Sequence, residues 1–106
     1  MDSFGNLIRR LRESRGLLLR EVASSLGIDP SLLSRIECDK KRATRAQVVQ
    51  LAAILSADEN ELIIFYLRDN LVYELLGEEL ATRAISAAEK RIKYLAHQPI
   101  VPEDKG

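Results

Sequence analysis

Two short helical patterns stand back to back in residues 20–37, and no other feature restricts the fold of this chain as strongly. The segment REVASSLGIDPSLLSRIE holds two patterns of about nine residues each, joined by a turn that contains Gly27 and Pro30. Isolated helices of this length are only marginally stable in water. Packing within a small helical core must therefore stabilise them, although the second helix offers that core only Leu33 and Ile36 as clear apolar contacts.

The start of the chain adds a further helix. Apolar side chains recur every three or four residues over residues 4–11, which is the spacing of one helical face. Ser3 is expected to cap this helix and Gly16 to end it. Further along, Asp29 is expected to cap the helix that begins at Pro30, because its carboxylate can accept a hydrogen bond from a free backbone amide.

Two capping-box patterns mark the next helix starts. Thr44 is followed three residues later by Gln47, ahead of an apolar run. Asp58 is followed in the same way by Glu61. The pattern predicts an all-α fold with five helices by about residue 68, and we assign residues 1–68 to one domain.

The residues after this domain are predicted to form a helical extension. A short segment at 70–76 is expected to end at Gly77, and a final helix is expected at 78–95. Residues 69–95 are therefore assigned to the extension. The tail at 96–106 contains two prolines and no periodicity, which is typical of disorder.

Composition and charge restrict the class of protein. The single cysteine, Cys38, cannot form an internal disulfide, and no apolar run is long enough to span a bilayer, so we expect a cytoplasmic protein. Residues 1–50 contain ten lysines and arginines against six acidic residues, whereas the remainder contains six against ten. A basic half joined to an acidic half favours a polyanionic partner for the first, although a solvated surface carries the same imbalance.

No residue pattern in the sequence supports catalysis. The one histidine, His97, lies in the tail, and there is no His–Cys cluster, glycine-rich phosphate loop or nucleophile with a base at useful spacing. We therefore predict no enzyme activity, no cofactor and no metal site. Tyr66, Tyr73 and Tyr94 stand at apolar positions of helices, where packing explains them.

The turn between the two short helices has two interpretations. Two short helices joined by a tight turn with glycine form a helix-turn-helix motif, in which the second helix enters the major groove of DNA. A corner in any small helical bundle has much the same spacing. The residues by themselves leave both interpretations open.

A resemblance to a known family favours the first interpretation. Residues 16–62 resemble the lambda-repressor-like, Xre-type helix-turn-helix family over nearly its whole five-helix length. The matching positions are Gly16-Leu17, Glu21-Val22-Ala23, Leu26-Gly27-Ile28, Ser34-Arg35-Ile36-Glu37, and Leu51-Ala52 with Leu55. The final helix is also similar to that of short regulators of this family found beside restriction–modification genes.

The resemblance implies that the third helix contacts DNA bases. The matching base-reading positions are Pro30, Ser31 and Arg35, with Leu32 and Ser34 alongside. Arg35 can form a bidentate pair with guanine. Leu32 can touch a thymine methyl group, or can be a partly buried core residue.

The resemblance also assigns roles to residues around the third helix. Phosphate contacts are expected from Arg20, Lys40, Lys41, Arg42 and Arg45, which would otherwise be solvated surface. Glu37 matches the acidic residue that pairs with an arginine of the first helix, here Arg12, in a structural ion pair.

Two departures from the family pattern concern the second helix and the turn after the third. Leu18 and Leu19 stand where the family usually has a serine or threonine followed by glutamine, so a cap and a polar DNA contact are missing. Asp39 replaces the turn glycine that usually follows the third helix, and aspartate adopts the left-handed conformation less readily than glycine does.

The second half of the chain is predicted to form a homodimer. One short recognition helix reads few base pairs, whereas two helices about 34 Å apart read a palindromic site on double-stranded DNA. Apolar residues 81, 85, 88, 92 and 95 recur at spacings of four and three, typical of a helix–helix seam that pairs with a second copy or folds back on its own domain. The residues assigned to dimerisation are Phe65, Leu71, Leu75, Ala81, Ile85, Ala88 and Ile92.

A protein-binding module is the rival function. In that interpretation the chain is an antitoxin or helical adaptor whose acidic second half binds a toxin or another protein partner. Binding to DNA, tested by gel shift, distinguishes the two functions. The operator sequence, the regulated gene and the choice between repressor and activator cannot be deduced from the sequence.

Overall fold

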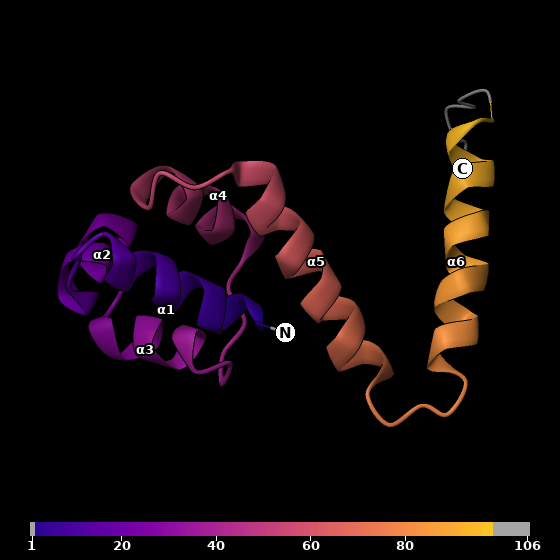
Figure 1. Ribbon diagram of the computed structural model, residues 1–106, viewed down its shortest axis with the longest axis horizontal. Helices are drawn as coiled ribbons and strands as arrows, with labels where there is room; N and C mark the ends of the chain where they lie inside the picture. The colour runs from indigo at the N-terminus through magenta and orange to yellow at the C-terminus, as the bar shows by residue number, and fades with distance from the viewer. Residues whose placement is uncertain (1, 99–106) are drawn as a thin grey trace, which may run out of the picture. The chain divides into compact units, whose positions relative to one another are not determined.

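The computed structural model describes residues 2–98, and within them the fold is all-helical, as predicted (Figure 1). The helices are α1 (Phe4–Ser14), α2 (Leu19–Leu26), α3 (Pro30–Glu37), α4 (Arg45–Ile54), α5 (Glu59–Leu75) and α6 (Ala81–Ala96). The chain divides into two compact units, of which the first ends at Glu74 and the second begins at Leu75. The first unit contains α1 to α4 and nearly all of α5, and the second contains α6.

The first unit is built around one hydrophobic core. Helix α3 packs on α1 and α2, and α2 packs on α4. The phenyl ring of Phe4 meets the ring of Tyr66 from α5 edge to face, with 6.2 Å between the centroids. The buried apolar residues are Phe4, Leu7, Ile8, Val22, Ala23, Leu26, Leu33, Ile36, Ala43, Val48, Leu51, Ala52, Leu55 and Leu62. Every helix of this unit therefore contributes to the same core, and burial of each large aliphatic side chain stabilises it by about 1.5–3 kcal/mol.

The caps of three helices agree with the sequence prediction. Ser3 Oγ accepts a hydrogen bond from the amide of Asn6 at 3.1 Å and so caps α1. At α4, Thr44 Oγ1 accepts from the Gln47 amide at 3.1 Å, and Gln47 Oε1 accepts from the Thr44 amide at 2.9 Å. At α5, Asp58 Oδ1 accepts a hydrogen bond from the Glu61 amide at 3.0 Å. Each cap satisfies amide groups that have no partner within the helix.

Three predictions about helix ends are wrong. The Asp29 side chain makes no capping hydrogen bond at α3. Segment 70–76 is not a separate element, because α5 continues through it to Leu75. The last helix begins at Ala81 instead of residue 78, because the Glu78 amide closes a turn on the Leu75 carbonyl at 2.9 Å. The predicted disorder after residue 98 lies outside the described residues, and Ala96 belongs to α6.

Two carboxylates from distant segments bind the free amides at the start of α1. The Phe4 amide donates to Asp69 Oδ2 of α5 at 2.7 Å, and the Gly5 amide donates to Asp39 Oδ1 at 3.1 Å. The partial positive charge at a helix N-terminus favours such anionic acceptors. One end of α1 therefore fixes both α5 and the loop at 38–44.

Glycine at position 5 allows α1 to approach α3 closely. A β-carbon on Gly5 would lie 2.4 Å from the carbonyl oxygen of Ile36 and 2.7 Å from that of Glu37. Because both contacts are backbone atoms, Gly5→Ala should force the helices apart and lower the free energy of unfolding by about 1–3 kcal/mol, measured by urea denaturation. Asn6→Ala, at the exposed neighbouring position, is the control and should change it by about 0.5 kcal/mol or less. Equal stability of the two variants would contradict this prediction.

Candidate nucleic-acid interface

The turn between α2 and α3 has a conformation that favours glycine. Gly27 ends α2 with φ of 73°, in the left-handed region where side chains with a β-carbon are strained. The amide of Ile28 donates to the carbonyl oxygen of Ala23 at 3.0 Å, which closes the helix end. Pro30 then occupies the first position of α3, where the helix needs no amide hydrogen. Local sequence therefore determines where α3 begins relative to α2.

Helix α3 has one buried face and one exposed face. Leu33 and Ile36 are fully buried in the core, and Glu37 is buried beside them. The predicted base-reading residues lie on the other side: Pro30, Ser31 and Arg35 are exposed, whereas Leu32 and Ser34 are half-buried. Leu32 packs against the core. The partly buried position that the sequence offered as an alternative to a thymine contact is therefore present. No ion pair within residues 2–98 involves Arg35, whose guanidinium is therefore available to a partner.

Arg12 and Glu37 form a bidentate ion pair between α1 and the end of α3. Arg12 Nε donates to Glu37 Oε2 at 2.7 Å, and Nη2 donates to Oε1 at 3.0 Å. Nη1 donates to the carbonyl oxygen of Leu17 at 3.0 Å, in the turn before α2. The hydrogen bond to Glu37 raises the pKa of Arg12, although burial opposes this shift. The pair joins α1, α3 and the turn between α1 and α2 by charged hydrogen bonds.

The second residue of the loop at 38–44 is left-handed although it is not glycine. Asp39 has φ of 60°, and the Lys40 amide donates to the carbonyl oxygen of Arg35 at 2.8 Å. The Asp39 carboxylate accepts hydrogen bonds from Ser3 Oγ and from the Gly5 amide. These bonds offset the strain of the left-handed conformation and explain why aspartate occupies this turn.

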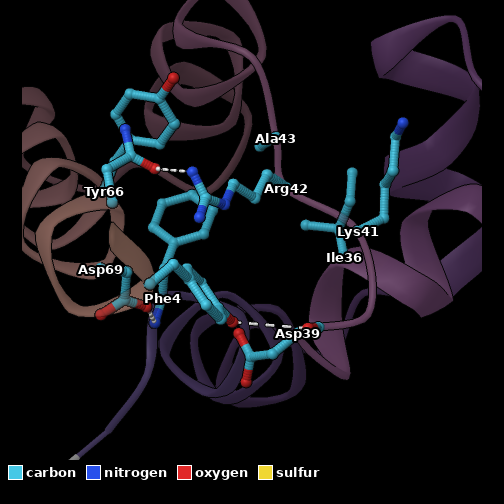
Figure 2. Close-up of a pocket in the computed structure, with 10 residues that line it drawn as sticks. Phe4, Ile36, Asp39, Lys41, Arg42, Ala43, Tyr66 and Asp69 are labelled. Atoms are coloured by element: carbon cyan, nitrogen blue, oxygen red, sulfur yellow. Dashed lines mark hydrogen bonds between the residues drawn. The ribbon is translucent and has the colours of Figure 1, made fainter. Parts of the chain in front are cut away.

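The lining of a small cavity between the loop at 38–44 and α5 includes Lys41, Arg42 and Tyr73. The Arg42 side chain runs toward α5, whereas the ammonium end of Lys41 points away from the cavity (Figure 2). The Arg42 guanidinium lies 4.5 Å from the centre of the Tyr73 ring, and Nη1 lies 3.5 Å from Asn70 Oδ1. Burial and the carboxylates of Asp39 and Asp69 raise the pKa of the Tyr73 phenol, and Arg42 opposes this shift. The phenol therefore stays protonated and can donate a hydrogen bond.

The five cations predicted to contact phosphate share one property. All five are exposed, and none forms an ion pair with a carboxylate of residues 2–98, whereas the arginines at positions 9, 10, 12 and 68 do. They are Arg20 in the first turn of α2, Lys40, Lys41 and Arg42 in the loop, and Arg45 at the start of α4. Cations without an acidic partner near helix N-termini are suited to bind an anion.

Comparison with known proteins identifies the first unit. A family model described as a helix-turn-helix domain matches residues 3–62, more than half of the chain. The chain belongs to the helix-turn-helix domain family. The predicted resemblance to the lambda-repressor-like, Xre-type regulators is thereby confirmed at the level of family and fold.

Two solved structures share the fold of this helix-turn-helix protein. The clp gene regulator ClgR from Corynebacterium glutamicum is similar with a TM-score of 0.55 and 21% sequence identity, over 89% of each chain. The SinR protein/SinI protein complex contains a chain that is similar with a TM-score of 0.52 and 20% identity, over 90% of this chain and 99% of that one. A comparison with curated proteins found no match.

Outside the helix-turn-helix motif, apolar side chains remain exposed on two helices. Ile64, Leu67 and Leu71 follow one another at spacings of three and four on α5, and each is at least 45% exposed. No residue of α6 is buried, and Ile85 and Ile92 are exposed with the small Ala88 between them. The remaining residues assigned to dimerisation are less exposed: Ala81 and Leu75 are half-buried, and Phe65 packs against the core of its own unit.

Sequence reasoning missed the residues of α5 that hold this helix-turn-helix domain. Asp69 binds the start of α1, Arg68 donates to the carbonyl oxygen of Asp2 at 2.6 Å, and Tyr73 lies beneath Arg42. The available signal was the polar run Arg68-Asp69-Asn70, which interrupts the apolar residues 62–67 and 71–73 of α5. No helix in residues 2–98 has both the length and the apolar content that crossing a membrane requires. The same residues contain no group of three or more histidine, cysteine or acidic side chains placed to hold a metal ion.

Proposed function

We propose that this helix-turn-helix protein is a sequence-specific, double-stranded DNA-binding transcriptional regulator that acts as a homodimer on a palindromic operator. The exposed face of α3 is the observation that carries this proposal. Within residues 2–98, Arg35 on this face has no acidic partner, the other face of the helix is buried, and the last residue of the helix is held by Arg12. A helix exposed on one side and fixed on the other is suited to enter a major groove, which is about 12 Å wide.

In this proposal, different residues of α3 contact different bases of one half-site. Arg35 donates two hydrogen bonds to the O6 and N7 atoms of a guanine. Ser31 and Ser34 donate to or accept from neighbouring base edges. Leu32, which is half-buried, offers its remaining surface to a thymine methyl group, and Pro30 places the start of the helix in the groove.

The cations around α3 bind the DNA backbone in this proposal. Arg20, Lys40, Lys41, Arg42 and Arg45 supply positive charge on the segments that precede and follow α3. Contacts of this type orient the protein on the duplex and contribute most of the affinity that does not depend on sequence.

Arg35→Ala should weaken binding to the selected operator by about 1–3 kcal/mol and relax the preference at one base pair of each half-site. Lys41→Ala is the matched variant, because it also removes one exposed cation from the same region. It should weaken binding to all duplexes alike and lower the slope of log affinity against log salt by about 0.9. Fluorescence anisotropy on operator and random duplexes, at several salt concentrations, measures both effects. An equal loss by Arg35→Ala on both duplexes would contradict base reading.

A second candidate function is a protein-binding module, in the manner of an antitoxin. It is supported by the exposed apolar residues of α6 and by the fold shared with a chain of the SinR protein/SinI protein complex. In that case the first unit would show no preference between operator and random duplexes, and α6 would bind a different protein instead of a second copy. Sedimentation of the pure protein distinguishes the two possible partners of α6. A homodimer forms in the pure protein, whereas a complex with a different protein does not.

A further inference from the structure

The loop between α3 and α4 is fixed on both sides of two exposed lysines. On the first side, the Asp39 carboxylate is bound by Ser3, which caps α1, and by Gly5 in the first turn of α1. On the second side, Ala43 is buried in the core at 5% exposure. Lys40 and Lys41 lie between these anchors, and their side chains are exposed.

One side chain of α5 contacts the loop on both sides of the lysine pair. The Tyr73 hydroxyl donates a long hydrogen bond of 3.4 Å to the carbonyl oxygen of Asp39, just before the lysines. The ring of the same tyrosine lies 4.5 Å from the guanidinium carbon of Arg42, just after them. Asn70, one turn earlier on α5, adds the contact of 3.5 Å to Arg42. In Figure 2, Asp39 and Arg42 both lie at the cavity beside α5.

We propose that Tyr73, through Arg42 and the Asp39 carbonyl, positions Lys40 and Lys41 for contact with the DNA backbone. These three residues form a clip between α5 and the loop, and the inference rests on the proposed DNA-binding function. Among the five cations assigned to phosphate, Arg42 then acts as a positioning residue. Its guanidinium is directed to the ring and to Asn70, whereas Lys41 points away from the cavity (Figure 2).

The physical basis of the clip is preorganisation. A loop that must become ordered on binding loses conformational entropy at that moment, and a loop already fixed does not. Lysine has a flexible stem, so the backbone beneath it decides whether the ammonium group can reach a phosphate. The arginine–tyrosine contact is weak at an exposed site, but the loop segment that it has to hold in place is only four residues long, from Asp39 to Arg42. The position of α5 thereby influences the affinity of a DNA contact that α5 does not itself make.

Tyr73→Ala and Tyr73→Phe test the clip in the full-length protein. Tyr73→Ala should lower affinity for a random duplex by about five- to tenfold and reduce the salt slope by about one, because one lysine no longer binds reliably. Tyr73→Phe retains the ring under Arg42 and loses only the long hydrogen bond of 3.4 Å to the Asp39 carbonyl, so it should stay within about twofold of the wild type. The matched control is Tyr94→Ala, which removes a tyrosine 5.9 Å from the Arg91 guanidinium on α6 and should change neither quantity.

A double-mutant cycle tests whether Tyr73 affects DNA affinity through its contact with Arg42. Arg42→Ala should cause the same loss as Tyr73→Ala, and the double variant should lose no more than either one. Losses that add would overturn the clip, because Arg42 would then contact phosphate by itself. If Tyr73→Ala proves unfolded by circular dichroism, Tyr73→Leu takes its place in the cycle and is judged by the same criteria, because leucine retains apolar packing and removes the ring beneath Arg42. A wild type that binds no duplex overturns the proposed function together with the clip, whereas a binding wild type matched by Tyr73→Ala overturns the clip alone.

Discussion

Glu37→Ala is expected to lower the free energy of unfolding by about 3 kcal/mol, because it leaves the charge of Arg12 without its partner inside the protein. The Arg12 side chain is only 12% exposed and Glu37 only 4%, so water cannot replace the lost carboxylate efficiently. One hydrogen bond to the carbonyl oxygen of Leu17 would remain. Urea denaturation followed by circular dichroism measures the change.

The control for this prediction is an ion pair on the surface of α1, the helix that carries Arg12. Glu13→Ala breaks the contact of 3.3 Å with Arg9, in which both side chains are more than half exposed. This change should cost about 0.5 kcal/mol or less, because water solvates the freed arginine. If the two variants lost the same stability, the buried pair would have no special role in holding α1 on α3.

A double substitution distinguishes the orphaned charge from lost packing. Arg12→Met with Glu37→Met removes both charges and retains most of the side-chain volume. It should recover most of the stability lost by Glu37→Ala, since well-packed apolar residues often replace a buried pair at little cost. No recovery would mean that the destabilisation comes from the geometry of the α3 end.

Ile85→Glu should lower operator affinity at least about tenfold while leaving the helix-turn-helix unit folded, because a dimer engages two half-sites at once. Ile85 is 43% exposed on α6, in line with Ala88 and Ile92 at spacings of three and four. A carboxylate in an apolar seam would have to lose its water on association. Truncation after Leu76 should act in the same way.

The control for the dimer prediction adds the same charge one residue away. Ser86→Glu lies outside the seam on α6 and should change neither operator affinity nor the oligomeric state. Sedimentation at micromolar concentration should give a dimer for the wild type and for Ser86→Glu, and a monomer for Ile85→Glu. A monomeric wild type whose operator affinity survives truncation would refute the homodimer.

Local signals in the sequence predicted most of the helix caps, which depend on neighbouring residues, although the cap expected from Asp29 does not form. The cap by Ser3 and the box of Thr44 with Gln47 both form, because each joins residues three positions apart. The continuation of α5 past residue 68 could not be predicted. Asp69 and Asn70 are poor helix formers, but here they bind the start of α1 and the Arg42 side chain, and these tertiary contacts override local preference.

The same distinction applies to the candidate site. The exposed face of α3 follows from helical periodicity, since Leu33 and Ile36 can only face the core. The orientation of Arg42 depends on Tyr73, which lies 31 positions later in the chain, and no pattern within the loop indicates it. The conformation of Asp39 likewise depends on Ser3 and Gly5, which is why the sequence suggested a weakened turn where the structure has a supported one.

Selection of bound sequences from a pool of random duplexes tests the central claim most directly, because it requires no knowledge of the operator. The wild type should enrich a two-fold symmetric site with half-sites about 34 Å apart, one turn of the duplex. The Arg35→Ala variant should enrich a site that lacks one specified guanine in each half. A pool that remains random after repeated rounds with the wild type would contradict sequence-specific recognition by α3.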